Sequence, residues 1–196
     1  MDTSRTYTMR ARADAKAATR QRILRAALEL GEEKMTIEIT LDEVASRAGT
    51  SVQTVLRHFG SRDGMLDEAI KLSSAEVAEE RRAPVGDVDA AMDAIVAHYE
   101  RRGDFVLHLL GQEHDARIGA VVGPGKALHR AWVEEVFAPQ LDARPAAGRD
   151  ALVDLLVVAT DVYAWKLLRR DRGLDAATTR HRMLTLVAAI LARPSD

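Results

Sequence analysis

Residues 40–66 leave this chain little freedom in how it folds, because they carry a dense set of helix start and stop signals. They read TLDEVASRAGTSVQTVLRHFGSRDGML. Thr40, with Glu43 three residues later, forms a capping box that satisfies backbone N–H groups of a first helical turn. Apolar residues then recur at helical spacing up to Gly49, which permits the left-handed backbone that ends a helix. Ser51 can cap a second helix, so the stretch predicts two short helices joined by a tight turn.

Two short helices joined by a glycine-containing turn describe a helix-turn-helix. Such motifs place base-reading side chains in the first turn of the second helix, here Val52, Gln53 and Thr54. Polar and cationic neighbours can hold DNA phosphates. The residues expected in that role are Thr40, Arg57, His58 and Arg62, with Ser51 at the helix cap. The alternative is an ordinary helical hairpin whose polar face is solvated.

This stretch resembles the DNA-binding domain of the TetR family of transcriptional repressors, over roughly residues 20–70. The matching residues are Thr40, the run LDEVASRAG, Ser51, Thr54-Val55, Arg57-His58-Phe59, Ser61-Arg62 and Met65-Leu66. One departure is Leu56, which stands where the family usually has a Tyr that holds a phosphate. Leu cannot donate a hydrogen bond, so this residue does not support that contact. Gly64 is a second oddity, since glycine is a poor helix former near a helix start.

Composition is that of an ordinary globular protein, with 196 residues, 47% hydrophobic and 30% charged. Abundant Ala and only 4% aromatic residues favour an all-helical fold. The absence of Cys excludes disulfides and thiolate chemistry and fits a reducing cytoplasm. No apolar run is long enough for a membrane span, and no apolar segment follows the basic N-terminal residues, so neither a span nor a signal peptide is expected.

Charge is unevenly distributed along the chain. The net charge is −2, yet residues 1–25 carry seven basic and two acidic residues. A chain that is basic at one end and acidic elsewhere is typical of a protein whose DNA-binding part lies at that end. Residues 1–18 are expected to form a flexible basic arm that reaches phosphates or a minor groove. A solvated tail is the alternative.

The resemblance implies an all-α protein with an N-terminal three-helix DNA-binding domain, a C-terminal helical ligand-binding and dimerisation domain, and about nine helices. The expected division is the arm over 1–18, the helix-turn-helix domain over 19–66 and the ligand-binding and dimerisation domain over 67–196. Outside the motif, helices are predicted over 19–34, 61–82, 87–102, 104–116, 124–140, 148–171 and 175–193. The predicted breaks are Pro84-Val85-Gly86, Gly103, Gly123-Pro124-Gly125, residues 139–145 and Gly173.

The last two predicted helices, over 148–171 and 175–193, are apolar on nearly every face. A helix of this kind needs partners on several sides. Two such helices from each of two chains can form a four-helix interface, which is the homodimer that the resemblance implies. The alternative is the core of a monomer.

The resemblance also implies a small-molecule site between the middle helices. The candidate ligand-binding residues are Tyr99, Phe105, His108 and Trp132, which are large and aromatic or polar-tipped. Ordinary core packing explains each of them as well. Asp104 and His108 lie one helical turn apart, but a closed metal site needs three or four ligands, so neither a metal nor another cofactor is expected.

The sequence therefore predicts a cytoplasmic, homodimeric, sequence-specific DNA-binding regulator: a repressor released from a palindromic operator by a small-molecule ligand. It is not expected to be an enzyme, because no nucleophile motif, phosphate loop or pair of acid–base carboxylates is present. A second hypothesis is a helical small-molecule-binding or catalytic protein whose helix-turn-helix is only scaffold. A third is an architectural DNA binder without a ligand cavity.

Overall fold

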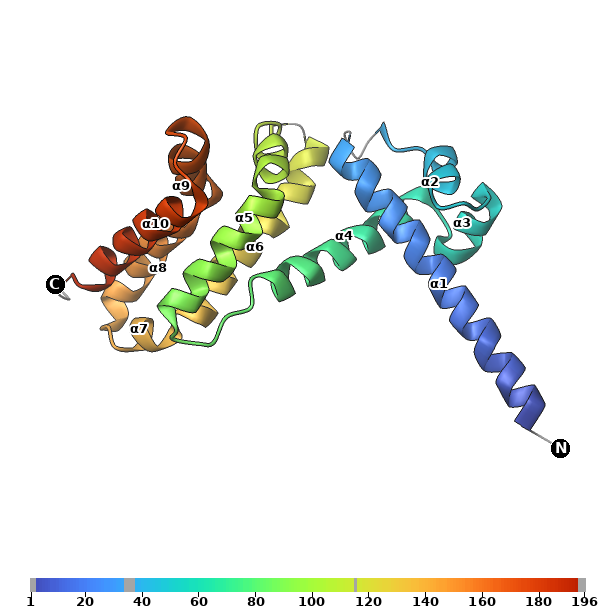
Figure 1. Ribbon diagram of the computed structural model, residues 1–196, viewed down its shortest axis with the longest axis horizontal. Coiled ribbons are helices and arrows are strands. Elements are labelled where there is room, and N and C mark those ends of the chain that lie inside the picture. The colour runs from blue at the N-terminus through green and yellow to red at the C-terminus, as the bar shows by residue number, and fades with distance from the viewer. Residues whose placement is uncertain (1–2, 34–37, 115, 194–196) are drawn as a thin grey trace. The chain divides into compact units, whose positions relative to one another are not determined.

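A computed structural model describes residues 3–33, 38–114 and 116–193 of the chain (Figure 1). The ordered elements among these residues are helices and none is a strand, which confirms the predicted all-α class. The chain forms two compact units, one up to Ala75 and one from Glu76 onward. Each unit has its own hydrophobic core. No helix among the described residues combines the length and the apolar character needed to cross a membrane.

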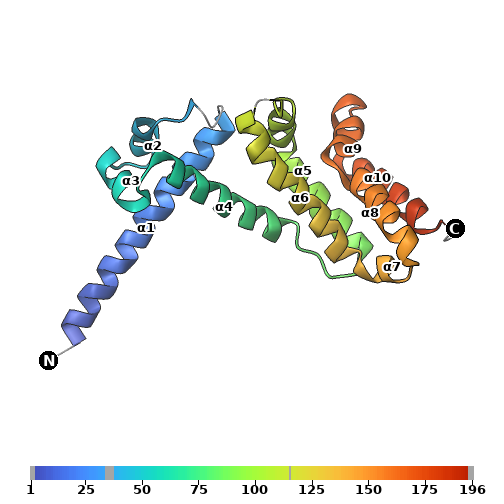
Figure 2. The same ribbon diagram turned by 180° about the vertical axis from the view of Figure 1, so that it is seen from behind.

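The first unit contains helices α1 (Thr3–Glu33), α2 (Leu41–Arg47) and α3 (Val52–Phe59) and the greater part of α4 (Arg62–Glu80). Helices α2 and α3 lie beside the second half of α1 (Figures 1 and 2). The side chains that close this core are Ile23 from α1, Val44 from α2, Val55 from α3 and Met65 from α4, each with no exposed surface. One small core thus holds the apolar faces of all four helices together.

Helix α1 begins at Thr3, whereas the sequence led us to expect a flexible arm over 1–18 and a helix from residue 19. The early segment is rich in Ala and Arg, which are strong helix formers, so it extends the helix toward the N-terminus. Residues 9–18 are all exposed, and packing begins only in the second half of the helix, where Ile23 is buried.

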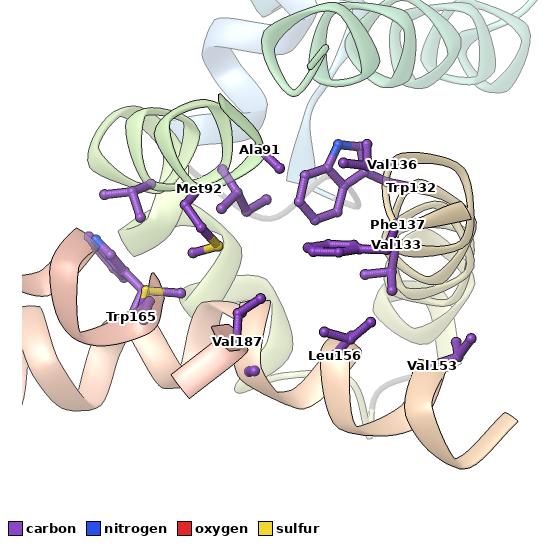
Figure 3. Close-up of a cluster of buried hydrophobic side chains, with 14 of the residues drawn as sticks. Ala91, Met92, Trp132, Val133, Val136, Phe137, Val153, Leu156, Trp165 and Val187 are labelled. Carbon is purple, nitrogen blue, oxygen red and sulfur yellow. The ribbon is translucent and has the colours of Figure 1, made fainter. Parts of the chain in front are cut away.

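The second unit begins with the last turn of α4 and contains the rest of the helices. Their bounds are α5 (Val88–Leu110), α6 (Ala116–Val136), α7 (Ala138–Asp142), α8 (Ala146–Thr160), α9 (Val162–Lys166), a π-helical turn (Leu167–Asp171) and α10 (Ala176–Leu191). Figure 3 shows how Met92 of α5, Trp132 of α6, Leu156 of α8 and Val187 of α10 meet in the core.

Two predicted breaks in this unit are wrong, because helices run through them, and the break predicted over 139–145 is wrong in its first part, because α7 covers Ala138–Asp142. Gly103 lies inside α5, where its missing side chain makes room for Trp165: a Cβ at this position would lie 2.5 Å from the ring atom Cζ3. The run Gly123-Pro124-Gly125 lies inside α6. A proline there removes one backbone donor, and the packed face around Trp132 and Val133 holds the helix nonetheless.

The helix predicted over 148–171 is instead divided at Asp161. Its backbone is extended (φ −71°, ψ 155°), and its carboxylate accepts a hydrogen bond from the backbone N–H of Tyr163 at 2.8 Å. Aspartate thereby ends α8 and caps α9, since its side chain competes with the helical backbone for donors. The sequence showed Asp161 as a polar interruption of an apolar helix that could face a pocket, an interface or the surface, and gave no sign that a helix ends there. The last helix, α10, lies within the predicted range 175–193.

Candidate nucleic-acid interface and buried polar cluster

The start of α2 carries the predicted capping box. The backbone N–H of Thr40 donates to Glu43 Oε2 at 2.9 Å, and the backbone N–H of Glu43 donates to Thr40 Oγ1 at 3.3 Å. The Thr40 hydroxyl also donates to Glu43 Oε2 at 2.8 Å. These bonds fix where α2 begins and hold the exposed Thr40 side chain in place.

The turn between the two helices is equally well determined. Gly49 has a φ of 62°, and the backbone N–H of Thr50 donates to the carbonyl of Ala45 at 2.9 Å. Ser51 then caps α3, accepting from the backbone N–H of Thr54 at 3.2 Å. The two helices are thus joined by a tight, hydrogen-bonded turn, as the sequence predicted.

The first turn of α3 presents its candidate base-reading residues unequally. Gln53 is exposed, Val52 and Thr54 are half-buried, and the next residue, Val55, is fully buried. The Thr54 hydroxyl also lies 3.0 Å from the hydroxyl of Ser51. Among the three candidates, Gln53 therefore has the side chain best placed to reach a base edge.

Cationic side chains gather near the last turn of α3. Arg57 is exposed, and no partner for its guanidinium is found among the described residues. Burial and then three nearby cations lower the pKa of His58 below its ordinary value; the cations are Arg57, Lys16 and Arg20. Arg20 also lies over the ring of Phe59, 4.8 Å from its centroid. Arg20 is also paired with Glu68, so Arg57 and Lys16 are the cations here that suit DNA phosphates.

Arg62 has a structural contact that the sequence did not reveal. Its Nε donates to the carbonyl of Ile39 at 2.6 Å, and Nη1 donates to Asp63 at 3.2 Å. The side chain thereby ties the start of α4 to the residue before the α2 cap.

The structure explains why position 64 is a glycine although glycine is a poor helix former: a Cβ there would lie 2.7 Å from the carbonyl oxygen of Phe59. Leu56, where the resemblance led us to look for Tyr, is 38% exposed and offers no donor.

The four candidate ligand-binding residues do not form one group. Tyr99 and Trp132 are buried in the same core. Phe105 is half-buried, and His108 is exposed and bonded to Gln112 one turn later on α5. The carboxylate of Asp104, the residue considered with His108, is taken by Arg170 through bonds of 2.9 and 3.0 Å. Among the described residues no three His, Asp or Glu side chains gather as a metal site would require.

Sequence reasoning missed a set of buried polar side chains around Tyr99 and Trp132. The missed side chains are Arg81, His98, His129 and Thr160, and together with Tyr99 and Trp132 they form the polar cluster. The available signal was the position of His129, which shares the face of α6 with Trp132, Val133 and Val136 and therefore had to be buried with them. Arg81 carries no comparable signal, because it lies just after the end of α4.

A charged network adjoins the cluster at the end of α4. His98 Nδ1 bonds Glu80 Oε2 at 2.7 Å, and Arg102 donates two hydrogen bonds to Glu80 Oε1 at 3.0–3.1 Å. Burial opposes ionisation of Glu80, but bonds from Arg102 and His98 outweigh it and lower the pKa of this carboxyl to about 2. Burial and the charge of Arg81 lower the pKa of His98 to about 4, so its ring is neutral near pH 7.

Comparisons with known proteins agree with this reading of the first unit. Residues 23–69 match the family model described as bacterial regulatory proteins, tetR family. A search of curated proteins gives no match. The fold is similar to the crystal structure of a tetR-family transcriptional regulator from Streptomyces coelicolor, with a TM-score of 0.62, 20% sequence identity, and coverage of 87% of this chain and 81% of that chain. At that identity the similarity shows the fold alone.

A capped helix-turn-helix whose second helix has an exposed first turn is the arrangement of a DNA-binding domain. The match over α2, α3 and the first part of α4 identifies the family of that domain. The first unit therefore carries a DNA-binding domain of the tetR family, and the fold of the chain is similar to that of a tetR-family regulator.

Proposed function

We propose that the chain is a homodimeric repressor that binds a palindromic operator and leaves it when a small molecule binds the second unit. The observation that carries the proposal is the first turn of α3, which is anchored by the buried Val55 while the Gln53 side chain is exposed to solvent. A regulator of this kind works where the chromosome is, so we place it in the cytoplasm. It acts by binding and not by catalysis.

In the bound state Val52, Gln53 and Thr54 read base edges in the major groove. The residues assigned to phosphates are Thr40, Ser51, Arg57, His58 and Arg62. Arg57 is the strongest of these, because its guanidinium is exposed and adds to a local excess of positive charge. Arg62 is the weakest of these, because its Nε is bonded to Ile39 and its Nη1 to Asp63, and a phosphate would have to compete with these contacts.

A homodimer through α8 and α10 is supported by the apolar side chains that these packed helices leave in solvent. Val158 on α8 is 67% exposed and Leu186 on α10 is 46% exposed, and Leu155 is exposed as well. Large apolar side chains grouped on adjacent helices are typical of a subunit interface. A two-fold dimer through this surface would present two α3 helices to the two halves of a palindrome.

Release by a ligand requires that the two states of the repressor bind it with different affinity. Helix α4 is the element best suited to couple ligand binding to DNA binding. It begins at Arg62, next to the helix-turn-helix, and its last residue, Glu80, bonds His98 and Arg102 of the second unit. Tyr99 and Trp132 are the candidate ligand contacts with the best support, since both lie in the polar cluster. Phe105 and His108 remain weaker candidates.

The test of the function is selection of bound sequences from a random duplex library at roughly physiological salt, where specific and non-specific binding separate. We expect an enriched palindrome. The matched variant is Gln53→Ala, which should change the base preference within each half-site and leave the fold intact. Loss of binding to all sequences alike in this variant would remove Gln53 from base reading.

The outcome decides between the proposal and its alternatives. If the folded, dimeric protein enriches no sequence, the helix-turn-helix is scaffold and the chain is a helical ligand-binding protein. If it binds DNA without preference and no small molecule alters that binding, the chain is an architectural DNA binder.

A further inference from the structure

Arg81 is a buried cation that lacks a carboxylate partner. It is 8% exposed, and no carboxylate among the described residues forms a salt bridge with it. Its Nη2 donates to His98 Nε2 at 2.9 Å, which is a neutral acceptor because His98 gives its own ring proton to Glu80. Its Nε has no hydrogen-bond partner within the described part of the chain. Burial lowers the pKa of Arg81 and outweighs Glu80 and Asp161, which favour the charged guanidinium without touching it, so a fold that keeps this cation gains from an anion in direct contact with it.

His129 offers an unused acceptor in the same cluster. The hydroxyl of Thr160 donates to the carbonyl of Leu156 at 2.7 Å, so it has no proton left for His129. The 3.2 Å contact between Thr160 Oγ1 and His129 Nε2 is therefore a bond donated by His129. The proton lies on Nε2, and Nδ1 carries a lone pair. His129 is 6% exposed, and Nδ1 finds no donor among the residues that the structure describes.

Two paths of direct contacts connect Arg81 with His129. Along one, the Trp132 ring stacks on His129 with centroids 5.7 Å apart, and its Nε1 donates to the carbonyl of Arg81 at 2.8 Å. Along the other, the guanidinium of Arg81 lies 5.7 Å from the centroid of the Tyr99 ring, and the Tyr99 hydroxyl donates to the carbonyl of Thr160 at 2.9 Å. Arg81 and His129 thus belong to one contact network with the rings of Tyr99 and Trp132. They are close enough that, after burial, the charge of Arg81 lowers the pKa of His129 further.

We propose that this cluster binds a small organic acid, whose carboxylate accepts from Arg81 Nε while a hydroxyl or N–H group of the same molecule donates to His129 Nδ1. Tyr99 and Trp132 supply the apolar contacts to its body. Charge-assisted hydrogen bonds from a guanidinium are among the strongest hydrogen bonds in proteins. The two oxygens of a carboxylate also match the planar arrangement of the N–H donors of the guanidinium. The inference rests on the proposed function, because it names the chemical class of the effector.

The test compares acids with their amides in thermal unfolding of the full chain. The probes are 4-hydroxybenzoate, benzoate, 4-hydroxybenzamide and benzamide. We expect the two acids to raise the Tm, by about 5–10 °C at a hundredfold excess over Kd, and the amides to leave it unchanged. 4-Hydroxybenzoate should exceed benzoate, since only it carries a donor for His129. Equal shifts from acids and amides, or no shift from either acid, would overturn the proposal.

Variants assign the effect to the two side chains. Arg81→Gln should abolish the shift from both acids, whereas Arg82→Gln, the same charge change at an exposed neighbour, should preserve it. His129→Phe keeps a ring against Trp132 and should make the two acids equivalent. An undiminished shift in Arg81→Gln would refute the assignment. If that variant does not fold, the comparison of acid with amide on the unaltered chain still decides.

The same probes separate this inference from the proposed function. The readout is a mobility shift on the selected operator with 4-hydroxybenzoate added. Release of the operator by neutral compounds, with no dependence on Arg81, would disprove the acid site and leave the repressor in place. Binding of the acids through Arg81 by a protein that enriches no operator would keep the site and disprove the repressor.

Discussion

Replacing Gly103 by Ala tests whether α5 passes through this position because the Trp165 ring requires it. In most exposed helix interiors the change would stabilise by about 1 kcal/mol, since Ala is the better helix former. Here the new methyl group would lie 2.5 Å from Cζ3 and 2.7 Å from Cη2 of Trp165, whereas carbon atoms in contact are normally about 3.5–4.0 Å apart. The ring must therefore move by about 1 Å.

That displacement has two costs. Overpacking of a core typically destabilises by about 1–3 kcal/mol. The movement also disturbs the hydrogen bond that Trp165 Nε1 donates to Glu100 Oε1 at 2.8 Å. A bond to a charged acceptor contributes about 1.5–3 kcal/mol. After subtraction of the helix gain, we expect Gly103→Ala to lower the free energy of unfolding of the second unit by about 1.5–5 kcal/mol.

Urea unfolding followed by tryptophan fluorescence measures this effect directly. Both tryptophans of the chain, Trp132 and Trp165, lie in the second unit, so the signal reports on that unit. The control is Gly125→Ala, also inside a helix but with no atom within 4 Å of the added methyl group. It should stabilise by up to about 1 kcal/mol. If Gly103→Ala were as stable as the control, the packing argument would be wrong.

Three further predictions concern DNA binding, assembly and pH. Arg57→Ala should weaken binding to all DNA sequences and lower the salt slope of log K by about 1, measured by titration at several salt concentrations; an unchanged slope would remove Arg57 from phosphate contact. Val158→Asp should convert the dimer to a folded monomer in sedimentation analysis, whereas Val85→Asp, at an exposed position outside the helices, should remain dimeric; a dimeric Val158→Asp would place the interface elsewhere. Burial lowers the pKa of His129 to about 4 in the fold, so the unfolded chain binds more protons between pH 4 and about 6.5. Stability is therefore fully present above about pH 6.5 and lost as the pH falls toward 4, at up to about 1.4 kcal/mol per pH unit for each such histidine. His129→Phe should roughly halve that slope, because His98 keeps its own contribution; an equal slope would contradict the buried neutral state of His129.

The helix-turn-helix could be predicted from sequence because its signals are local. A capping box, a glycine with positive φ and a serine cap act within three or four residues, and the structure has each of them where the sequence placed it. The extent of α1 was missed because charge suggested a flexible arm, whereas the helical propensity of the same residues favours a helix.

Tertiary contacts explain the other differences. Gly103 looks like a helix end until Trp165, distant in the sequence, occupies the space beside it. Asp161 looks like one polar residue on an apolar helix until its carboxylate caps α9. The polar cluster could not be assembled from sequence, because its members come from the end of α4 and from α5, α6 and α8, and only the folded core brings them together.

In the first turn of α3, different residues serve packing and the proposed DNA recognition. Val55 closes the core, while the side chain of Gln53 has no part in it. Substitutions at such exposed positions usually change stability by no more than about 0.5 kcal/mol. If Gln53 reads bases as proposed, position 53 can therefore accept new side chains, and with them new operator preferences, without a compensating change elsewhere. Divergence of target genes among descendants of this protein should begin there, and the buried residue two positions later should stay apolar.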